Sequence, residues 1–271
     1  MPNPDRCNDG SVNFGFVVPW ADAADVGELA ATAERCGWDG LFVWEPVWGV
    51  DAWISLAVAA TRTSTIKLGT MLTPLPRRKP WEVASQVATL DRLSSGRTIL
   101  GVGLGAPSSG YDAFGEITDR KIRAELMDEG LDILRGLWSG APFSHSGSHY
   151  TLTPSDFPAF GHTAQQRGVP IWCVGAIGSA KSMNRALSCS GLIPQIVEPN
   201  GARQCTLEEL QSLQLPKHFD VVVEGSHTEH SPAAWEDAGA TWWLESLWSA
   251  VSDPDAVDAA MQVLQAGPPP G

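Results

Sequence analysis

The feature that most constrains the fold is a regular alternation of short β-rich runs with longer helical runs. The short runs are rich in Val, Ile, Phe and Trp, whereas the long runs repeat apolar residues every three or four positions. In chain order, the expected strands and helices cover residues 13–18, 22–36, 40–44, 51–62, 67–72, 80–93, 98–102, 121–139, 170–174, 182–188, 192–196, 206–213, 219–223, 232–238, 241–244 and 255–265. Eight strand–helix pairs predict an α/β fold, a (β/α)8 TIM barrel, with a doubly wound open sheet as the alternative.

The length favours a single barrel domain over residues 1–271, because such barrels typically contain roughly 250 residues. Residues 1–11 and 267–271 are expected to be flexible, the latter because Gly-Pro-Pro-Pro-Gly cannot continue a helix. Two long insertion loops are expected, over 105–120 after the fourth strand and over 140–169 before the fifth. The second contains a pattern around Gly147 that predicts a small hairpin. Loops of this length commonly form lids or binding loops.

Composition excludes several classes of protein. The net charge of −13 would repel phosphate backbones, so no nucleic-acid partner is expected. No apolar run reaches the roughly 18 residues of a membrane helix, and the polar N-terminus has no signal-peptide core. The odd number of scattered cysteines predicts reduced thiols in a cytoplasmic protein, without a disulfide framework or a metal site. They are Cys7, Cys36, Cys173, Cys189 and Cys205.

The ends of the third and fourth expected strands are the first candidates for a binding site. Residues 66–74 end in Thr-Met-Leu-Thr-Pro, and residues 97–105 end in Gly-Val-Gly-Leu-Gly. Ligands of parallel α/β proteins lie at the carboxyl ends of strands, so these segments predict a floor for a flat ligand. Gly101 and Gly103 indicate close backbone approach, because a third glycine and a following helix, as in a dinucleotide-binding loop, are missing.

Aromatic and acidic residues follow the other strands. Trp20, Trp44 and Trp48 are candidates for walls around a ligand, since aromatic faces pack on rings. Glu45 follows the second strand and could act as an acid or base, or form a salt bridge at the barrel rim. Glu245, at the end of the eighth strand, could face the same pocket or serve packing alone.

The run Arg77-Arg78-Lys79 is the only tight basic cluster in this acidic chain. Its position after the third strand predicts that Arg77 and Arg78 bind an anionic part of a ligand, with a solvated loop as the alternative. No His-Glu-x-x-His or paired-cysteine spacing indicates a metal, and no Gly-x-Ser-x-Gly elbow indicates a hydrolase.

Taken in order, these segments resemble the luciferase-like monooxygenase family of flavin- and deazaflavin-dependent barrel oxidoreductases. The match covers residues 13–196 well and the remainder weakly, and is carried by residues 37–44, 51–53, 66–74, 77–81, 88–97, 100–105, 128–138 and 170–175. The resemblance implies that a tricyclic ring lies across the mouth of the barrel, near Trp44, Thr70, Met71 and Thr73. It also implies a cis peptide bond between Thr70 and Met71.

In the same family the cofactor phosphate lies on the loop after the fifth strand. Here that loop contains Gly175, Ala176, Gly178 and Ser179, whose backbone N–H groups and following helix would suit an anion. The Asp-His pair that family members commonly carry after the second strand is absent, because Trp44-Glu45-Pro46 stands there.

The resemblance implies a homodimeric enzyme that uses reduced coenzyme F-420 or FMN to reduce or oxygenate a small-molecule substrate. An FMN-dependent monooxygenase is one alternative. A barrel that has lost redox chemistry and acts as a binding protein or cofactor-free enzyme is another, because the Asp-His pair is missing. With coenzyme F-420, Arg77 and Arg78 would meet its anionic tail.

Overall fold

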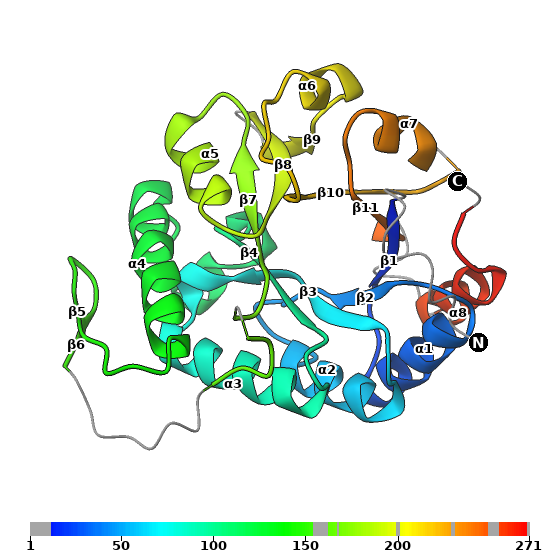
Figure 1. Ribbon diagram of the computed structural model, residues 1–271, viewed down its shortest axis with the longest axis horizontal. Helices are drawn as coiled ribbons and strands as arrows, with labels where there is room; N and C mark the ends of the chain where they lie inside the picture. Colours follow the sequence, from blue (N-terminus) through cyan, green and yellow to red (C-terminus); the bar gives the residue numbers. More distant parts are fainter. Residues whose placement is uncertain are drawn as a thin grey trace.

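Eight parallel strands close into a barrel in the computed structural model, which describes residues 12–153, 162–166, 168–198, 201–228, 231–248 and 255–269. Each strand pairs with its neighbours in the order β1-β2-β3-β4-β7-β8-β10-β11, and β11 pairs back to β1 (Figure 1). The barrel strands are β1 (Asn13–Val18), β2 (Gly40–Val43), β3 (Lys67–Pro74), β4 (Thr98–Gly103), β7 (Ile171–Ala176), β8 (Gly191–Glu198), β10 (Asp220–Gly225) and β11 (Trp242–Ser246). The expected TIM barrel is confirmed, and the open-sheet alternative is excluded by this closure.

Helices surround the strands as an outer ring, one after each strand (Figure 1). They are α1 (Ala23–Arg35), α2 (Ala52–Arg62), α3 (Pro80–Leu93), α4 (Arg120–Trp138), α5 (Ala180–Leu187), α6 (Leu207–Gln211), α7 (Pro232–Asp237) and α8 (Ala256–Ala266). Side chains cap several of them: Asp51 accepts a hydrogen bond from Ile54 N, and Thr206 and Glu209 form a capping box. The helical periodicity of the sequence therefore located the outer layer.

Large aromatic side chains fill the inside of the barrel. Trp172 lies 5.1 Å from both Phe42 and Trp242, measured between ring centroids. Small residues make this possible, because a Cβ atom added at Gly15 or Gly40 would come within 3.0 Å of the Phe42 ring. The interior is thus a packed core, and an open space can form only above it, at the barrel mouth.

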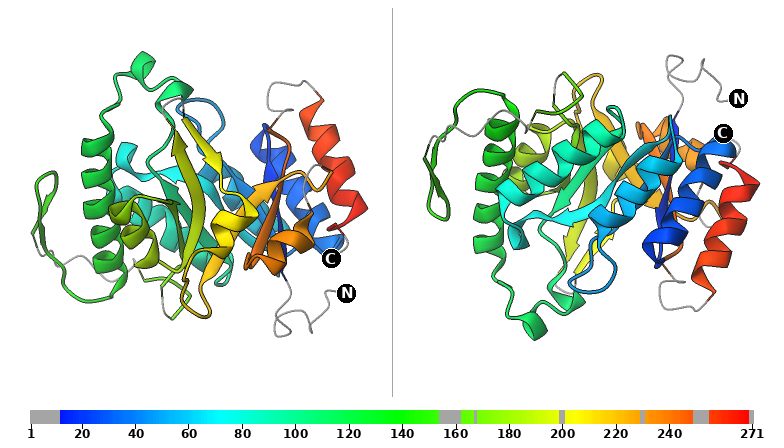
Figure 2. Two further views of the ribbon diagram at one scale, coloured as in Figure 1. Left: turned by 90° about the horizontal axis from the view of Figure 1, so that it is seen from above. Right: turned by 90° about the horizontal axis from the view of Figure 1, so that it is seen from below.

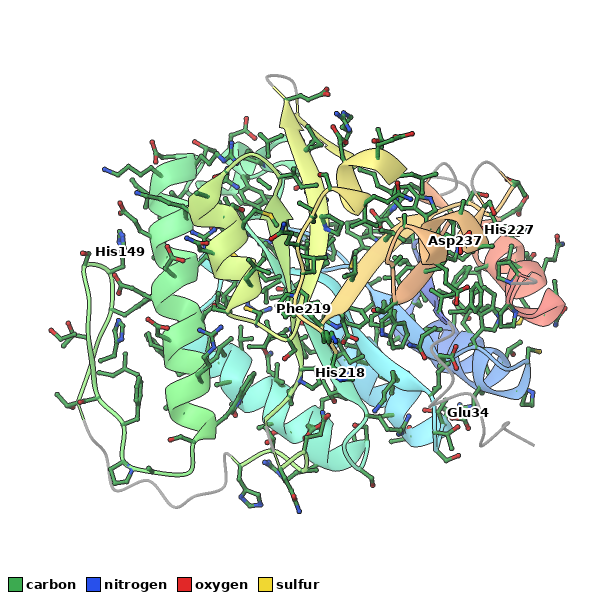
Figure 3. The ribbon with its side chains drawn as sticks, turned by 45° about the horizontal axis from the view of Figure 1, so that its top comes forward. Glu34, His149, His218, Phe219, His227 and Asp237 are labelled. Atoms are coloured by element: carbon green, nitrogen blue, oxygen red, sulfur yellow. The ribbon has the colours of Figure 1, made fainter. Side chains whose placement is uncertain are left out.

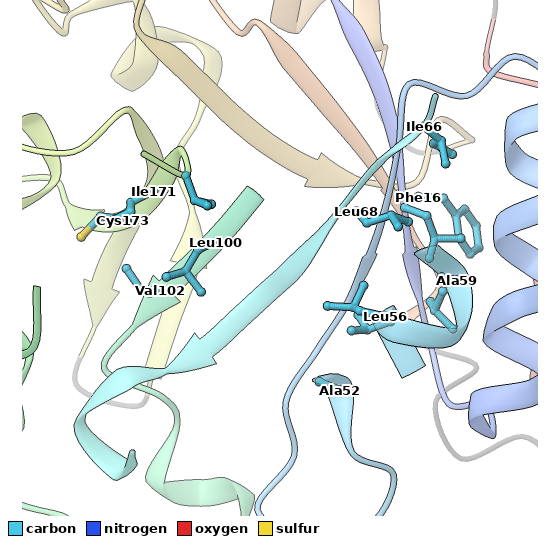
Figure 4. Close-up of a cluster of buried hydrophobic side chains, with 14 of the residues drawn as sticks. Phe16, Ala52, Leu56, Ala59, Ile66, Leu68, Leu100, Val102, Ile171 and Cys173 are labelled. Atoms are coloured by element: carbon cyan, nitrogen blue, oxygen red, sulfur yellow. The ribbon is translucent and has the colours of Figure 1, made fainter. Parts of the chain in front are cut away.

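A second, larger core separates the strands from the helices. Outward-facing side chains such as Phe16, Leu68 and Leu100 lie in this layer, and Leu56 of α2 packs against it from outside (Figure 4). The adjacent tryptophans of β11 divide as strand alternation requires: Trp242 joins the inner core and Trp243 the outer one. Odd and even strand positions therefore have opposite destinations, which decides which side chains reach the mouth.

The strands differ from the predicted boundaries mainly at their carboxyl ends. β3 continues to Pro74 and β7 to Ala176, two residues beyond the expected ends in each case. A further strand, β9 (Gly201–Gln204), pairs antiparallel with β8 and was not predicted. Its residues Gly-Ala-Arg-Gln lack a β-rich pattern, because backbone pairing with β8 rather than side-chain burial holds this short segment.

Both expected insertions are present. After β4 the chain forms short 3-10 turns, η2 (Pro107–Ser109) and η3 (Asp112–Phe114), as it does after β3 at η1 (Leu75–Arg77). Before β7 a hairpin of β5 (His145–Ser146) and β6 (Thr151–Leu152) projects beside α4 (Figure 2). Residues 1–11 and 270–271 lie outside the described part of the chain, and α8 ends just before Gly267, whose φ is +81°.

Two glutamates fasten outer segments to helices. Glu129 of α4 accepts hydrogen bonds from the backbone N–H of Ser148, His149 and Tyr150, while the His149 ring contacts Glu125 at 3.0 Å (Figure 3). On the opposite side of the barrel, Glu34 of α1 accepts backbone hydrogen bonds from residues 64–66 (Figure 3). Burial would raise the pKa of Glu34, but these hydrogen bonds lower it to about 2. No helix in the described residues is both long and apolar enough to cross a membrane.

Candidate active site

A pocket of about 840 Å³ lies at the carboxyl end of the barrel. Its walls come from β3, β4, β7, β8, β9 and β10, from α4 and α5, and from the segments that follow β2, β4 and β11. The lining side chains include Trp44, Glu45, Met71, Leu72, Gly103, Tyr111, Ala176, Arg185, Gln195, Glu224 and Trp248. A pocket of this size at this end of the barrel is where (β/α)8 enzymes place their active sites.

The floor between β3 and β4 contains an irregularity, which the family resemblance placed one residue too early. The cis peptide bond joins Met71 to Leu72, and not Thr70 to Met71. Thr70 still pairs in register with Leu100, and the register shifts only between Thr70 and Thr73. The bulge is therefore centred on Met71 and Leu72, which both line the pocket.

Three predicted cofactor-binding residues of this floor lie beneath the pocket surface. The Thr70 hydroxyl donates to the Gly101 carbonyl oxygen at 3.0 Å, and the Thr73 hydroxyl donates to Thr70 Oγ1 at 3.1 Å. Both threonines are completely buried. A Cβ atom at Gly101 would lie 2.2 Å from the Thr70 carbonyl oxygen, so this glycine is required by strand packing. These residues hold the two strands together around the bulge.

Gly103, by contrast, shapes the pocket itself. A Cβ atom there would lie 2.8 Å from Leu72 Cδ2 and 3.1 Å from Val174 Cγ2. Because the glycine has no side chain, the Leu72 and Val174 side chains pack directly on the β4 backbone, where β4 meets β3 and β7. Gly103, Leu72 and Val174 all line the pocket.

The loop after β7 forms the wall where the family resemblance places a phosphate. Ala176 lines the pocket, and its N–H donates to the Ser182 hydroxyl at 2.9 Å. Gly178 has φ +87°, which favours glycine, and Ser179 is the N-cap residue of α5. Gly175 faces away from open space, because its Cβ would lie 2.3 Å from Leu192 Cδ1. The loop thus combines a tight turn with a helix N-terminus beside the pocket.

Arginine side chains add positive charge to that side of the mouth. Arg120, Arg123 and Arg185 line the pocket. Arg185 forms a two-pronged ion pair with Asp128, at 2.5 and 3.0 Å, and Arg123 donates to the carbonyl oxygens of Leu104 and Gly105. Burial lowers the pKa of Arg123, although a guanidinium remains charged at neutral pH.

Tryptophans form the opposite side of the mouth. Trp44 packs against Trp20 at 5.5 Å and against Trp248 at 6.2 Å, and its indole N–H donates to the Pro19 carbonyl oxygen. Trp44 and Trp248 line the pocket, whereas Trp48 is 78% exposed and does not fill it. The hollow at the barrel mouth is therefore walled by aromatic faces and not plugged by them.

Glu45 and Arg78, predicted for separate roles, form an ion pair with each other. Glu45 also accepts a hydrogen bond from Trp53 Nε1 at 3.3 Å, and Arg78 donates to Gln86 at 2.8 Å. Arg77 contacts Glu116 at 3.3 Å and lies over the Tyr111 ring, 5.1 Å from its centroid. Both arginines are thus engaged with groups of the protein at the edge of the pocket.

Glu245 lies on the outward face of β11, away from the residues that line the pocket. Its carboxylate is almost fully buried and accepts hydrogen bonds from Trp243 Nε1 at 3.1 Å and from the His227 N–H at 3.0 Å. The alternation along β11 explains this position, since Trp242 and Leu244 point inward and the odd-numbered residues point outward. His230, the other histidine of that loop, lies outside the described residues.

Glu224, at the end of β10, is the functional candidate that sequence reasoning missed. It shares the inward parity of Val222, lines the pocket, and its Oε2 atom is buried without a hydrogen-bond partner among the described residues. Burial raises the pKa of Glu224 to about 7, although a hydrogen bond from the Trp248 side chain opposes the rise. The available signal was a carboxylate directly after the expected strand 219–223, the same criterion that selected Glu45.

Fold and pocket together define a (β/α)8 barrel protein with a ligand site at the carboxyl ends of its strands. The sequence profile of the luciferase-like monooxygenase family matches residues 9–259, and the chain belongs to this family. Among the described residues, no group of three or more His, Cys, Asp or Glu side chains is placed to hold a metal ion.

Several relatives are named for coenzyme F-420. A Mycobacterium tuberculosis protein described as a coenzyme F-420-dependent oxidoreductase is 32% identical over 184 residues, which cover 65% of this chain and 52% of the relative. The F-420-dependent glucose-6-phosphate dehydrogenase of Mycobacterium avium is 28% identical over 284 residues, 87% of this chain and 82% of the relative. The chain therefore spans about half the length of the first of these relatives.

Solved structures share the fold at low sequence identity. The F-420-dependent tetrahydromethanopterin reductase of Methanopyrus kandleri superposes with a TM-score of 0.73 at 16% identity, over 95% of this chain and 98% of the other. An F-420-dependent secondary alcohol dehydrogenase, solved with an F-420–acetone adduct, gives a TM-score of 0.73 at 18% identity, over 94% and 98%. These likenesses confirm the barrel architecture.

Proposed function

We propose that this chain is an oxidoreductase that uses the deazaflavin coenzyme F-420 to transfer hydride to or from a small organic substrate. The observation that carries the proposal is the open pocket of about 840 Å³ at the carboxyl end of a luciferase-like barrel. The names of the relatives support deazaflavin over FMN. The family and the fold alone do not choose between reduction and oxygenation.

The residues present fit a flat tricyclic cofactor. Gly103, Val174 and the bulge at Met71 and Leu72 form an apolar floor, and Trp44 offers an aromatic face beside it. The N–H groups of Ala176, Ile177 and Ser179 donate within the protein. Gly178 and the first turn of α5 would therefore hold the phosphate through backbone N–H groups, with Arg185 adding charge. A bound reduced deazaflavin supplies hydride.

Glu224 supplies the proton in this proposal. Hydride addition to a carbonyl carbon leaves negative charge on oxygen, which must be protonated. With a pKa of about 7, the Glu224 carboxyl is protonated in about half of the molecules at neutral pH and can donate or accept. Glu45, a second carboxylate of the pocket, is held in an ion pair by the Arg78 guanidinium. Glu224 thereby replaces the histidine that family members commonly place after the second strand.

Calorimetric titration of the purified protein with coenzyme F-420 and, separately, with FMN tests this function. We expect saturable binding of coenzyme F-420 and a loss of at least about tenfold in affinity for Gly103→Val, which would displace the Leu72 and Val174 side chains of the floor. Leu93→Ala on the exposed side of α3 is the matched control and should bind normally. Tighter binding of FMN would favour the monooxygenase alternative. Binding of neither cofactor would overturn the redox assignment.

The homodimer implied by the family resemblance also remains a proposal. Among the apolar side chains of α2, Ile54 is 62% exposed, whereas Trp53 is buried and Val58 packs near Gly27 of α1. Ile54 is thus the most available of these three to a second copy. Sedimentation analysis of the wild type and of Ile54→Lys should show a dimer and a weakened dimer, respectively; a monomeric wild type would contradict the proposal.

A further inference from the structure

Two thiols lie in contact on the outside of the barrel, away from the pocket. Cys173 is in β7 and faces the outer core, where it is completely buried. Cys189, in the turn between α5 and β8, packs against the same core and is partly exposed. The Cys173 side chain is hydrogen-bonded to that of Cys189. Strand β7 and the turn before β8 therefore bring together two cysteines that are separated in the sequence by α5.

A guanidinium group is held against one of the two sulfur atoms. Arg135, in the last turn of α4, lies 3.3 Å from Cys189 Sγ, measured from Nη2, which also donates to the Ser188 carbonyl oxygen at 2.9 Å. Its other amino group lies 3.6 Å from Asp132 at the surface. On α5, the Arg185 carbonyl oxygen accepts from the Cys189 thiol at 3.5 Å. The Ser188 contacts fix the positive charge of Arg135 beside the sulfur.

This arrangement makes the two thiols unequal. The hydrogen bond from Cys173, with a further contribution from Arg135, lowers the pKa of Cys189 to about 7 against the effect of burial. The hydrogen bond to Cys189 and burial raise the pKa of Cys173 well above its ordinary value. Cys189 is thus the more acidic thiol and the better nucleophile of the two, and Cys173 is the weaker acid in contact with it. Burial raises the pKa of Cys205 to about 11, so that thiol should be inert.

We propose that Cys189 and Cys173 form a peroxide-sensitive dithiol that closes to a reversible disulfide. The Cys189 thiolate attacks hydrogen peroxide, breaks its O–O bond and becomes a sulfenic acid, while hydroxide leaves. The Cys173 sulfur then attacks the Cys189 sulfur, forms the S–S bond and expels water. The two thiols lose two electrons in total, and the peroxide gains them. The S–S bond requires the two sulfur atoms to come within about 2 Å of each other.

The position of this pair connects it to the barrel mouth. The S–S bond would close a loop of chain over residues 173–189, which includes the whole of α5 and the turn at Gly178. Ala176 and Arg185 of the same loop line the pocket. Oxidation therefore acts on the strand–helix unit that builds one wall of the pocket, although the chemistry of the pair does not depend on any cofactor.

Peptide mapping of the wild-type protein after brief exposure to hydrogen peroxide tests the proposal directly. We expect a peptide pair joined through Cys173 and Cys189, two fewer titratable thiols, and full reversal by dithiothreitol. The Cys36 and Cys205 peptides should remain unmodified under the same treatment. A joined pair that involves other cysteines, or an unchanged thiol count, would overturn the proposal. Sulfinic acid at Cys189 without any disulfide would also overturn it.

Variants separate the two steps. Cys173→Ser keeps a hydroxyl donor beside Cys189 but removes the resolving thiol, so a sulfenic acid should accumulate and react with dimedone. Arg135→Gln should slow the reaction of Cys189 with peroxide by about three- to tenfold, because the fixed positive charge is lost. Arg92→Gln, an exposed arginine of α3, is the matched control and should leave the rate unchanged. Equal rates in the wild type, in Arg135→Gln and in Arg92→Gln would show that Arg135 does not activate the thiol.

Discussion

Glu224 is the residue whose surroundings are most unusual. Its pKa of about 7 in the folded protein lies above the value of 4.5 expected for an unfolded chain. Between these values the folded state binds more protons than the unfolded state, so Glu224 stabilises the fold below its unfolded pKa. That contribution is lost as the pH rises from about 4.5 through about 7.

Glu224→Gln should abolish this pH dependence, because the amide does not ionise. Relative to the wild type, the variant should gain on the order of 2 kcal/mol in unfolding free energy between about pH 5 and about pH 8. Chemical denaturation at the two pH values measures the change. The same variant should lose turnover, while Glu45→Gln, a second carboxylate at the pocket, should retain most of it. A parallel loss in both variants would argue against a special role for Glu224.

The ion pair of Glu45 and Arg78 gives a second prediction at this scale. Arg78→Met would leave the Glu45 carboxylate, whose side chain is only 9% exposed, without its charged partner. We expect a loss of about 1–3 kcal/mol in unfolding free energy, measured by urea denaturation.

Arg62→Met is the matched control for Arg78→Met. Its pair with Glu28 joins α2 to α1, and both side chains are more than half exposed. Solvent screens such a pair, so the loss should stay below about 1 kcal/mol. Equal losses in the two variants would mean that the burial of Glu45 does not matter.

Individual site residues could be predicted only where a position at the carboxyl end of a strand was enough to place them in the pocket. Trp44 and Glu45 line the pocket because they follow β2, and Gly103 because it is the last residue of β4. Glu245 satisfied the same criterion and yet faces outward, whereas Glu224 faces the pocket. Strand alternation places neighbouring residues of one strand on opposite faces. The sequence alone does not show which of the two faces the barrel axis.

At the scale of elements, periodicity located every barrel strand and every outer helix, because burial of one face repeats along each segment. The strand ends were less predictable. The last residues of β7 and β10 are Gly, Ala or Glu, and backbone pairing with neighbouring strands keeps them extended. The short strand β9 is held in the same way, by pairing with β8. Tertiary hydrogen bonds of this kind leave no local pattern in the sequence.

The hairpin β5–β6 depends on one side chain of α4. Burial would raise the pKa of Glu129, but hydrogen bonds from His145 and from three backbone N–H groups of the hairpin lower it. The ionised carboxylate therefore holds the hairpin at any pH above the usual pKa range of glutamate. It releases the hairpin only as the pH falls below that range.

Glu129→Ala should detach the hairpin without unfolding the barrel. Hydrogen exchange of the Ser148, His149 and Tyr150 amides should become faster, since each loses its acceptor. Glu125→Ala is the control, because Glu125 contacts only the exposed His149 ring of this hairpin. Unchanged protection in Glu129→Ala would show that the β5–β6 pairing suffices on its own.

At the scale of the whole molecule, large aromatic side chains fill the interior of the barrel. Trp172 is completely buried between Phe42 and Trp242, and its indole N–H donates to Asp220 at 2.9 Å. Trp172→Ala should reduce the unfolding free energy by about 3–5 kcal/mol, because it leaves a cavity and an unpaired carboxyl group. Trp48→Ala removes the same side chain from an exposed position and should change stability by less than about 0.5 kcal/mol. Guanidinium denaturation distinguishes the two.

The tryptophans at the rim have a spectroscopic consequence. Trp44 and Trp248 contribute their indole rings to the pocket surface, and Trp172 lies in the core below it. A chromophore that entered the hollow and absorbed at the wavelengths of indole emission would quench these rings by energy transfer. The intrinsic fluorescence of the protein should then dim in proportion to occupancy, which would make the molecule a label-free reporter of its own ligand.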